Sequence, residues 1–121
     1  MKDLSILDSL ITGRVEPHIY AFTTNTIPNY LKVGDTYRPV SKRLREWREY
    51  FPNLEQKFEG IAKITDDVYF RDFAVHYFLE SEKRRVRLKA SDLSEGGYYS
   101  KEFFREATVD DVEEAIADIH E

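Results

Sequence analysis

The sequence predicts an α+β fold in which a small, mainly antiparallel sheet of about three strands is flanked by helices. Aromatic and β-branched residues fill 18–24 and, after a polar turn, an apolar alternation resumes at 30–34. Two later segments, one from Pro39 and one from Asp66 or Asp67, space apolar residues by three and four, as helices do. With 121 residues, the chain has enough surface to bury for one core.

The elements follow in order along the chain. The run HIYAFTT at 18–24, the turn at 25–29 and the strand at 30–34 predict a β-hairpin. Pro39 opens a helix that Pro52 closes, with one apolar stripe at Val40, Leu44, Trp47 and Phe51. A third strand is expected over 58–64, with Gly60 marking a bulge.

The second half of the chain is expected to be helical. Asp66 or Asp67 caps a helix that runs to about Lys83 and is apolar around much of its circumference, so it should be the most buried one. Thr108 and Asp111 form an Asp variant of the capping box. They begin a last helix whose apolar positions are Val109, Val112, Ile116 and Ile119.

Residues 1–16 are expected to form an N-terminal helical extension, because Leu4, Leu7, Leu10 and Ile11 have helical spacing and Gly13 ends the pattern. The domain proper then covers 17–121. Its last helix is still in phase at Glu121, as in a fragment of a longer protein.

The amino-acid composition excludes several kinds of structural site. There is no cysteine, which excludes disulfides and Cys-based zinc sites, and 34% of the residues are charged. No signal peptide or bilayer-spanning stretch is visible, so we expect a cytoplasmic protein without a membrane partner.

The net charge of −5 is unevenly distributed. Six carboxylates and no Lys or Arg fall in 109–121, which leaves a net charge of +1 for the first 108 residues. Two basic clusters lie there: the first is Arg38, Lys42, Arg43, Arg45 and Arg48, and the second is Lys83, Arg84, Arg85, Arg87 and Lys89. Either cluster could bind phosphates. The residues expected to bind nucleic acid are Arg38, Lys42, Arg45, Arg84 and Arg85. Alternatively, both clusters are solvated helix faces neutralised in part by Glu46, Glu49, Glu80 and Glu82.

The chain has a strand that ends in HIY at 18–20, then a strand that ends in KVG at 32–34, and then a helix that bears Arg43. This order resembles that of the GIY-YIG nuclease superfamily. YLKVGDTYR at 30–38 is similar to the Tyr-Lys-Ile-Gly-x-Thr-x-Arg form of a phage-derived branch, with one additional residue. An acid, a His four residues later and a Glu-aromatic-Phe motif also belong to that branch. They correspond here to Asp72, His76 and EFF at 102–104.

This resemblance covers about residues 17–119 and implies an endonuclease-like fold and a DNA-cutting activity, as a module of a larger DNA-processing or restriction-type enzyme. It implies that Tyr20 is the general base or holds the water, that Arg43 binds the scissile phosphate and that Asp72 ligates one Mg²⁺ or Mn²⁺ ion. Gly34 would let the backbone approach the site, and the site residues are expected to converge on one face of the sheet. Lys32 replaces the family's second Tyr in the site, and His76 would orient Asp72, donate a proton or add a metal ligand.

Each of these residues also has a structural interpretation. Core packing alone would explain Tyr20 and His76. Arg43 would then be a solvated helix residue, Lys32 an exposed strand residue and Gly34 an ordinary turn residue. The family's metal ligand is Glu, and Asp72 is shorter by about 1.5 Å. A second hypothesis is therefore a domain that binds nucleic acid without cutting it. A third is a protein-interaction module, which an exposed apolar patch away from Arg43 would support.

Overall fold

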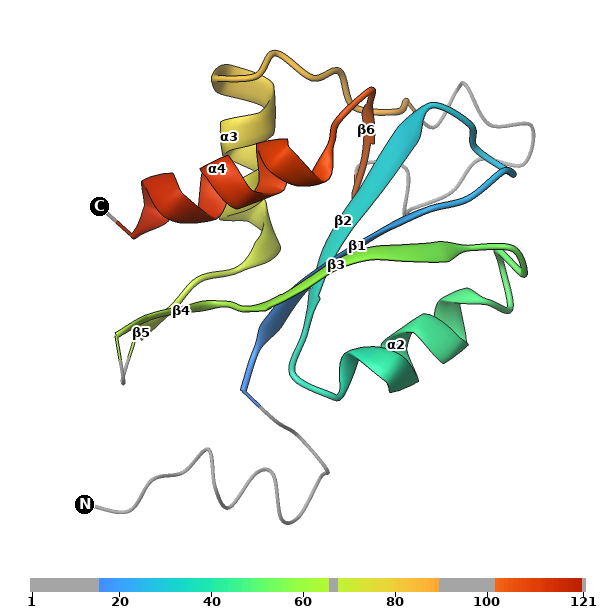
Figure 1. Ribbon diagram of the computed structural model, residues 1–121, viewed down its shortest axis with the longest axis horizontal. Coiled ribbons are helices and arrows are strands. Elements are labelled where there is room, and N and C mark those ends of the chain that lie inside the picture. Colours follow the sequence, from blue (N-terminus) through green and yellow to red (C-terminus); the bar gives the residue numbers. More distant parts are fainter. Residues whose placement is uncertain (1–15, 66–67, 90–101, 121) are drawn as a thin grey trace.

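The structure is a computed structural model that describes residues 16–65, 68–89 and 102–120. In this part of the chain, four strands form an antiparallel sheet of order β3-β1-β2-β6, and two short strands form a separate pair, β4-β5 (Figure 1). The predicted α+β fold is confirmed, with one strand more than expected in the main sheet. The elements are β1 (His18–Thr23), β2 (Tyr30–Thr36), α2 (Val40–Trp47), β3 (Glu55–Ile61), β4 (Lys63–Thr65), β5 (Val68–Tyr69), α3 (Asp72–Ser81), β6 (Phe103–Arg105) and α4 (Val109–Ile119).

The predicted hairpin is confirmed as β1 and β2, which pair from His18 opposite Thr36 to Phe22 opposite Lys32. This register places Tyr20 directly opposite Gly34. Because side chains alternate between the faces of a strand, Tyr20, Lys32 and Gly34 belong to the same face of the sheet.

The bulge in the third strand is not at Gly60, where we expected it. Ala21 pairs with Phe58 and Phe22 pairs with Gln56, so the additional residue lies between 56 and 58. Gly60 has a different role: a Cβ there would lie 2.9 Å from the ring of Phe58. The absence of a side chain lets this ring cover the strand.

The helix expected from Asp66 or Asp67 begins later, at Asp72, and the prediction of its start is wrong. Val68–Tyr69 forms strand β5, and residues 66–67 lie outside the described part. Arg71 at the N-cap offers no side-chain cap. The acceptor comes instead from Asp35 in β2, whose carboxylate binds the Asp72 N–H at 2.8 Å.

The expectation that this helix is the most buried one is also wrong, because three of its 10 residues are buried, against three of the eight in α2. Val75, His76 and Leu79 of α3 are buried, whereas Phe73 and Tyr77 are 66% and 73% exposed. The apolar and aromatic residues of α3 therefore lie on two faces of the helix, and only one of these faces belongs to the core.

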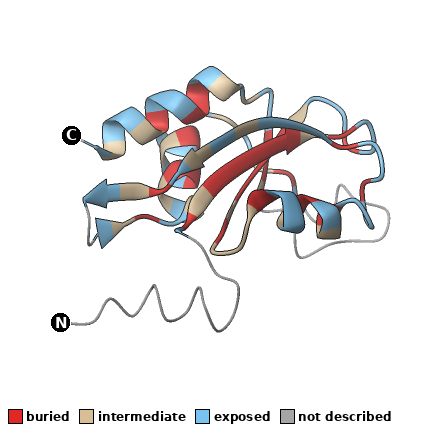
Figure 2. Cartoon of the chain, turned by 60° about the horizontal axis from the view of Figure 1, so that its bottom comes forward, coloured by how far each residue is buried: buried red, intermediate tan, exposed pale blue. Residues whose placement is uncertain are grey.

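Two hydrophobic clusters lie on opposite faces of the sheet. One joins Ile19, Leu31 and Val33 to α3 and α4, and the other joins Phe22 and Phe103 to α2 (Figure 1). Figure 2 shows the helices turning buried residues toward the sheet and exposed residues outward. Helix α4 belongs to the core because Val112 and Ala115 are buried in the first cluster.

The ends of two helices agree in part with the sequence. The capping box of Thr108 and Asp111 is present at the start of α4. Helix α2 ends at Trp47, and the remaining residues up to Phe51 continue as hydrogen-bonded turns. The predicted helix over 4–12 lies outside the described residues, and no helix within them is long and apolar enough to cross a bilayer.

Candidate functional site

The hydroxyl of Tyr20 is the centre of a buried polar cluster. Lys32 Nζ donates to it at 3.0 Å and Trp47 Nε1 at 2.7 Å, and the positive charge of Arg43 lies nearby. An indole N–H only donates, and a neutral phenol has two lone pairs and one proton. The Tyr20 oxygen can therefore accept both hydrogen bonds while it keeps its own proton.

Lys32 lies in the sheet with its side chain fully buried. Burial lowers the pKa of its ammonium group to about 8, against the opposing charge of Glu102, whose Oε2 lies 3.4 Å away. The ammonium nitrogen also lies 4.2 Å from the centre of the Trp47 ring. Burial raises the pKa of Tyr20. Of this pair, Lys32 is therefore the group that loses its proton first as the pH rises.

Gly34 makes room for this pair. A Cβ at position 34 would lie 2.6 Å from both Lys32 Nζ and the Tyr20 hydroxyl, closer than any van der Waals contact. The backbone of β2 thus approaches the polar cluster as only glycine permits.

Helix α2 brings Arg43 to the cluster and fixes it. The guanidinium stacks over the Trp47 ring with its Cζ 4.8 Å from the ring centre, and its Nη1 donates to Glu46 Oε1 at 2.9 Å. Glu46 also accepts two hydrogen bonds of 2.7 Å from Arg38. These two arginines lower the pKa of Glu46 to about 2. One carboxylate thus orients two cations beside Tyr20.

Helix α3 reaches the cluster at an open edge of the sheet. Strand β6 pairs with β2 only from Tyr30 to Lys32, so Val33 to Thr36 have no strand on that side in the described residues. His76 Nε2 donates to the Val33 carbonyl oxygen at 2.8 Å. A carbonyl oxygen only accepts, so Nε2 carries the proton and is not a metal ligand in this arrangement. Burial lowers the pKa of His76, which favours the neutral ring.

Asp72 and Glu102 form a carboxyl pair next to Lys32. Burial raises the pKa of each, and the two groups lie close enough to shift each other's pKa, which favours one proton shared by the pair. His76 Nε2 lies 3.9 Å from Asp72 Oδ2. Glu102 therefore connects the acid of α3 with the lysine of β2.

The carboxyl pair fits a Mg²⁺ or Mn²⁺ ion by its chemistry. Oxygen donors are the ligands that Mg²⁺ prefers, and this ion commonly uses one or two carboxylates together with water. A bound cation would take the place of the shared proton. In the described part of the chain, no three His, Cys, Asp or Glu side chains group closely enough to hold a metal by themselves.

The predicted site residues come together, but not on one face of the sheet. Tyr20, Lys32 and Gly34 lie on the face that α2 covers, and Asp72 and His76 come from the helix that packs on the other face. They meet because the short β6 leaves the edge of β2 open. A site at a sheet edge replaces the expected site on a single face.

The two basic clusters differ in their surroundings. In the first, Lys42 and Arg45 are exposed on α2, and Arg38 is bound to Glu46. In the second, Arg84 is exposed, whereas Arg85 lies 2.9 Å from Asp111. Lys83 and Arg87 are also paired, with Glu114 and Glu80. The second cluster is thus largely neutralised, by two acids of α4 and by Glu80 rather than by Glu80 and Glu82 on one helix face, and the first is the more basic surface.

Sequence reasoning missed three members of the site. Trp47 and Glu46 stand four and three residues after Arg43, spacings that share one helix face, so the pattern could have indicated them. Asp35 follows Gly34 directly but acts on a helix that begins 37 residues later. No local pattern indicates such a contact.

Fold and site together define a small α+β domain with a buried Lys–Tyr–Arg cluster beside a carboxyl pair. The chain belongs to the T5orf172 domain family, whose model matches residues 17–120. This is a phage-associated family, associated with nuclease and DNA-binding activity in phage-type proteins. The chain matches no curated protein and no solved structure at a significant level. The narrower resemblance to the GIY-YIG superfamily stays a prediction.

Proposed function

We propose that the chain is a divalent-metal-dependent endonuclease that hydrolyses DNA phosphodiester bonds, as a module of a larger DNA-processing or restriction-type enzyme. The observation that carries this proposal is the Lys32–Tyr20 pair at 3.0 Å, with Arg43 on one side and the Asp72–Glu102 pair on the other. Phosphodiester hydrolysis needs a base for the attacking water, a cation for the phosphate charge and ligands for a metal ion. This cluster offers all three.

The base is the Lys32–Tyr20 pair. With a pKa of about 8, Lys32 is partly uncharged near neutral pH, whereas burial keeps Tyr20 protonated. The proton of the attacking water passes to Lys32, directly or through the Tyr20 hydroxyl. Arg43 binds a phosphate oxygen, because its guanidinium is held in place by Glu46 and the Trp47 ring while its side chain is 31% exposed.

The acids Asp72 and Glu102 hold the cation. A bound Mg²⁺ or Mn²⁺ ion would neutralise charge on the phosphate and on the leaving oxygen. Asp72 is about one methylene shorter than the Glu of the family pattern, and the neighbouring Glu102 supplies a second carboxylate with a longer side chain. His76 is a positioning residue, because its Nε2–H ties α3 to the Val33 carbonyl.

DNA would lie along α2. Arg38, Lys42 and Arg45 place positive charge on the helix that carries Arg43, and Arg84 adds a cation from the second cluster. Such phosphate contacts make binding weaken steeply as salt concentration rises.

The test is a plasmid-nicking assay of the purified chain with Mg²⁺ or Mn²⁺. Arg43→Ala and Asp72→Asn should each abolish nicking, because one removes the phosphate ligand and the other a metal ligand. Arg48→Ala on the same helix and Asp118→Asn on α4 are matched controls that should nick at the normal rate. Activity that survives both site changes would exclude this mechanism.

The second candidate function is a domain that binds nucleic acid without cutting it. The shared proton of Asp72 and Glu102 favours it, since a proton held in this position competes with a cation. Salt-dependent DNA binding together with no Mn²⁺ binding, measured by titration calorimetry, would support this candidate over the nuclease.

A further inference from the structure

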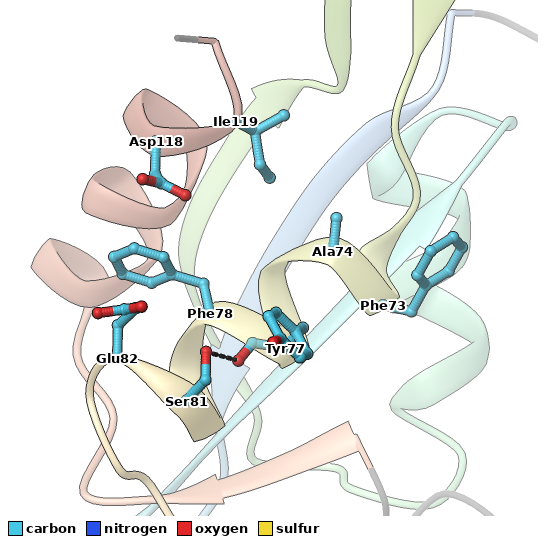
Figure 3. A pocket seen from close by; sticks show the side chains of 8 residues that line it. All are labelled: Phe73, Ala74, Tyr77, Phe78, Ser81, Glu82, Asp118 and Ile119. Atoms are coloured by element: carbon cyan, nitrogen blue, oxygen red, sulfur yellow. Dashed lines mark hydrogen bonds between the residues drawn. The ribbon is translucent and has the colours of Figure 1, made fainter.

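A groove between α3 and α4 is separate from the Tyr20 site. It has a volume of about 480 Å³ (Figure 3). Figure 3 shows that side chains of α3 form one wall and that Asp118 and Ile119 of α4 contribute the other. Its lining residues are Phe73, Ala74, Tyr77, Phe78, Ser81, Glu82, Asp118 and Ile119.

Two exposed aromatic side chains border this groove. Phe73 and Tyr77 are 66% and 73% exposed and lie four residues apart, on the same side of α3. Exposed apolar surface of this kind marks interaction sites in soluble proteins. Asp72 and His76 face the sheet edge, so the proposed nuclease site makes no use of the two rings.

The charges at the groove are negative. Glu82 and Asp118 have no cationic partner in the described part of the chain, whereas Asp111 and Glu114 of α4 are paired with Arg85 and Lys83. Helix α4 contains no Lys or Arg. The two carboxylates repel a polyanion such as DNA and attract cations, and the apolar floor between them favours apolar side chains. Together they suit an apolar segment that carries cations.

We propose that this groove binds an amphipathic helix of a partner protein, with apolar residues every three to four positions and Lys or Arg along its flanks. Grooves between two helices commonly accept a third helix in this way, with anchors at i, i+3 or i+4, and i+7. Phe73 and Tyr77 would contact the apolar anchors, and Glu82 and Asp118 the basic flanks. The groove lies on the side of α3 away from His76, so the partner leaves the nuclease site accessible.

The probe is a fluorescent 14-residue helical peptide of Leu and Lys, with Leu at helical spacing, and its Leu and Glu counterpart. In an anisotropy titration, the Lys peptide should bind and the Glu peptide should not. Tyr77→Glu should weaken binding of the Lys peptide by about tenfold or more. The double change Glu82→Lys and Asp118→Lys should reverse the preference between the two peptides.

Matched controls separate the groove from general charge attraction. Val86→Glu changes another exposed apolar residue, 58% exposed, and Glu49→Lys with Glu59→Lys reverses two exposed acids elsewhere. Both should leave peptide binding and the order of preference unchanged. Thermal unfolding shows whether each variant is folded. Equal loss of binding in the controls, or no loss with Tyr77→Glu, would overturn the proposal. It would also be overturned if sedimentation showed a dimer that Tyr77→Glu dissociates, since the groove would then hold a second copy.

Discussion

The carboxylate of Asp35 caps helix α3: its Oδ2 accepts the backbone N–H of Asp72 at 2.8 Å and lies 2.6 Å from Nε of Arg71. Asp35 follows Gly34 in β2. In this one strand, Gly34 makes room for the Lys32–Tyr20 pair, and Asp35 fixes the residue at which α3 begins. The acid of the site is thus oriented by a residue on the strand that carries its base.

Replacing Asp35 with Ala should lower the free energy of unfolding by about 1 kcal/mol, as loss of an N-cap does, and should reduce nicking because Asp72 loses its orientation. Asp35→Asn keeps an oxygen acceptor for the Asp72 N–H and should retain most of both. Denaturant unfolding and plasmid nicking measure the two effects. Equal damage from Asn and Ala would show that the negative charge, rather than the cap, is what matters.

Nicking should rise with pH through a midpoint near 8 and level off above about pH 9. The uncharged form of Lys32 is the active one, and its lowered pKa of about 8 sets the midpoint. Lys32→Arg keeps the charge but cannot release a proton in this range, so it should abolish nicking. Lys32→Met should also abolish nicking and should lower the melting temperature, because it leaves Glu102 without its partner in the buried pair.

The control for this pH profile is Lys42→Met, which removes an exposed lysine of α2 and should keep the midpoint near 8. A rate that continues to rise well above pH 9 would contradict the assignment of Lys32 and would favour the Tyr20 hydroxyl as the base.

Gly34→Ala should disable the site while leaving the fold largely intact. The new Cβ would lie 2.6 Å from Lys32 Nζ and from the rigid, buried Tyr20. Displacing them should cost about 1–3 kcal/mol of stability, as overpacking does, and should reduce nicking strongly. Gly60→Ala is a matched control: its Cβ would lie 2.9 Å from Phe58, outside the site, so it should affect stability alone.

The capping box of α4 should make stability depend on acid pH. Burial by itself would raise the pKa of Asp111, but hydrogen bonds from Arg85 and the Thr108 N–H hold it below its usual range. A lowered folded-state pKa means that this contribution is complete above about pH 4, the unfolded value, and is lost as pH falls through the folded one. Asp111→Asn should remove this part of the pH dependence in denaturant unfolding, and Asp110→Asn, its exposed neighbour, should not.

The sequence by itself determined the elements whose causes are local. The hairpin at 18–36 follows from alternating strand residues around a polar turn, and the start of α4 follows from Thr108 and Asp111. The order of Gly34 and Arg43 along the chain, which resembles a family motif, also singled out these two residues. Each of these patterns involves residues that are close in the sequence, so the sequence alone is enough to recognise it.

Only the tertiary structure decided where the site lies and what orients it. The start of α3 depends on Asp35, which is 37 residues away, and the position of Asp72 depends on the short β6 that leaves the edge of β2 open. The pKa of Lys32 falls because folding buries its side chain among Tyr20 and Trp47. Contacts between residues so far apart in the sequence arise from tertiary packing, and they produce no regular spacing of residues that could be recognised in the sequence.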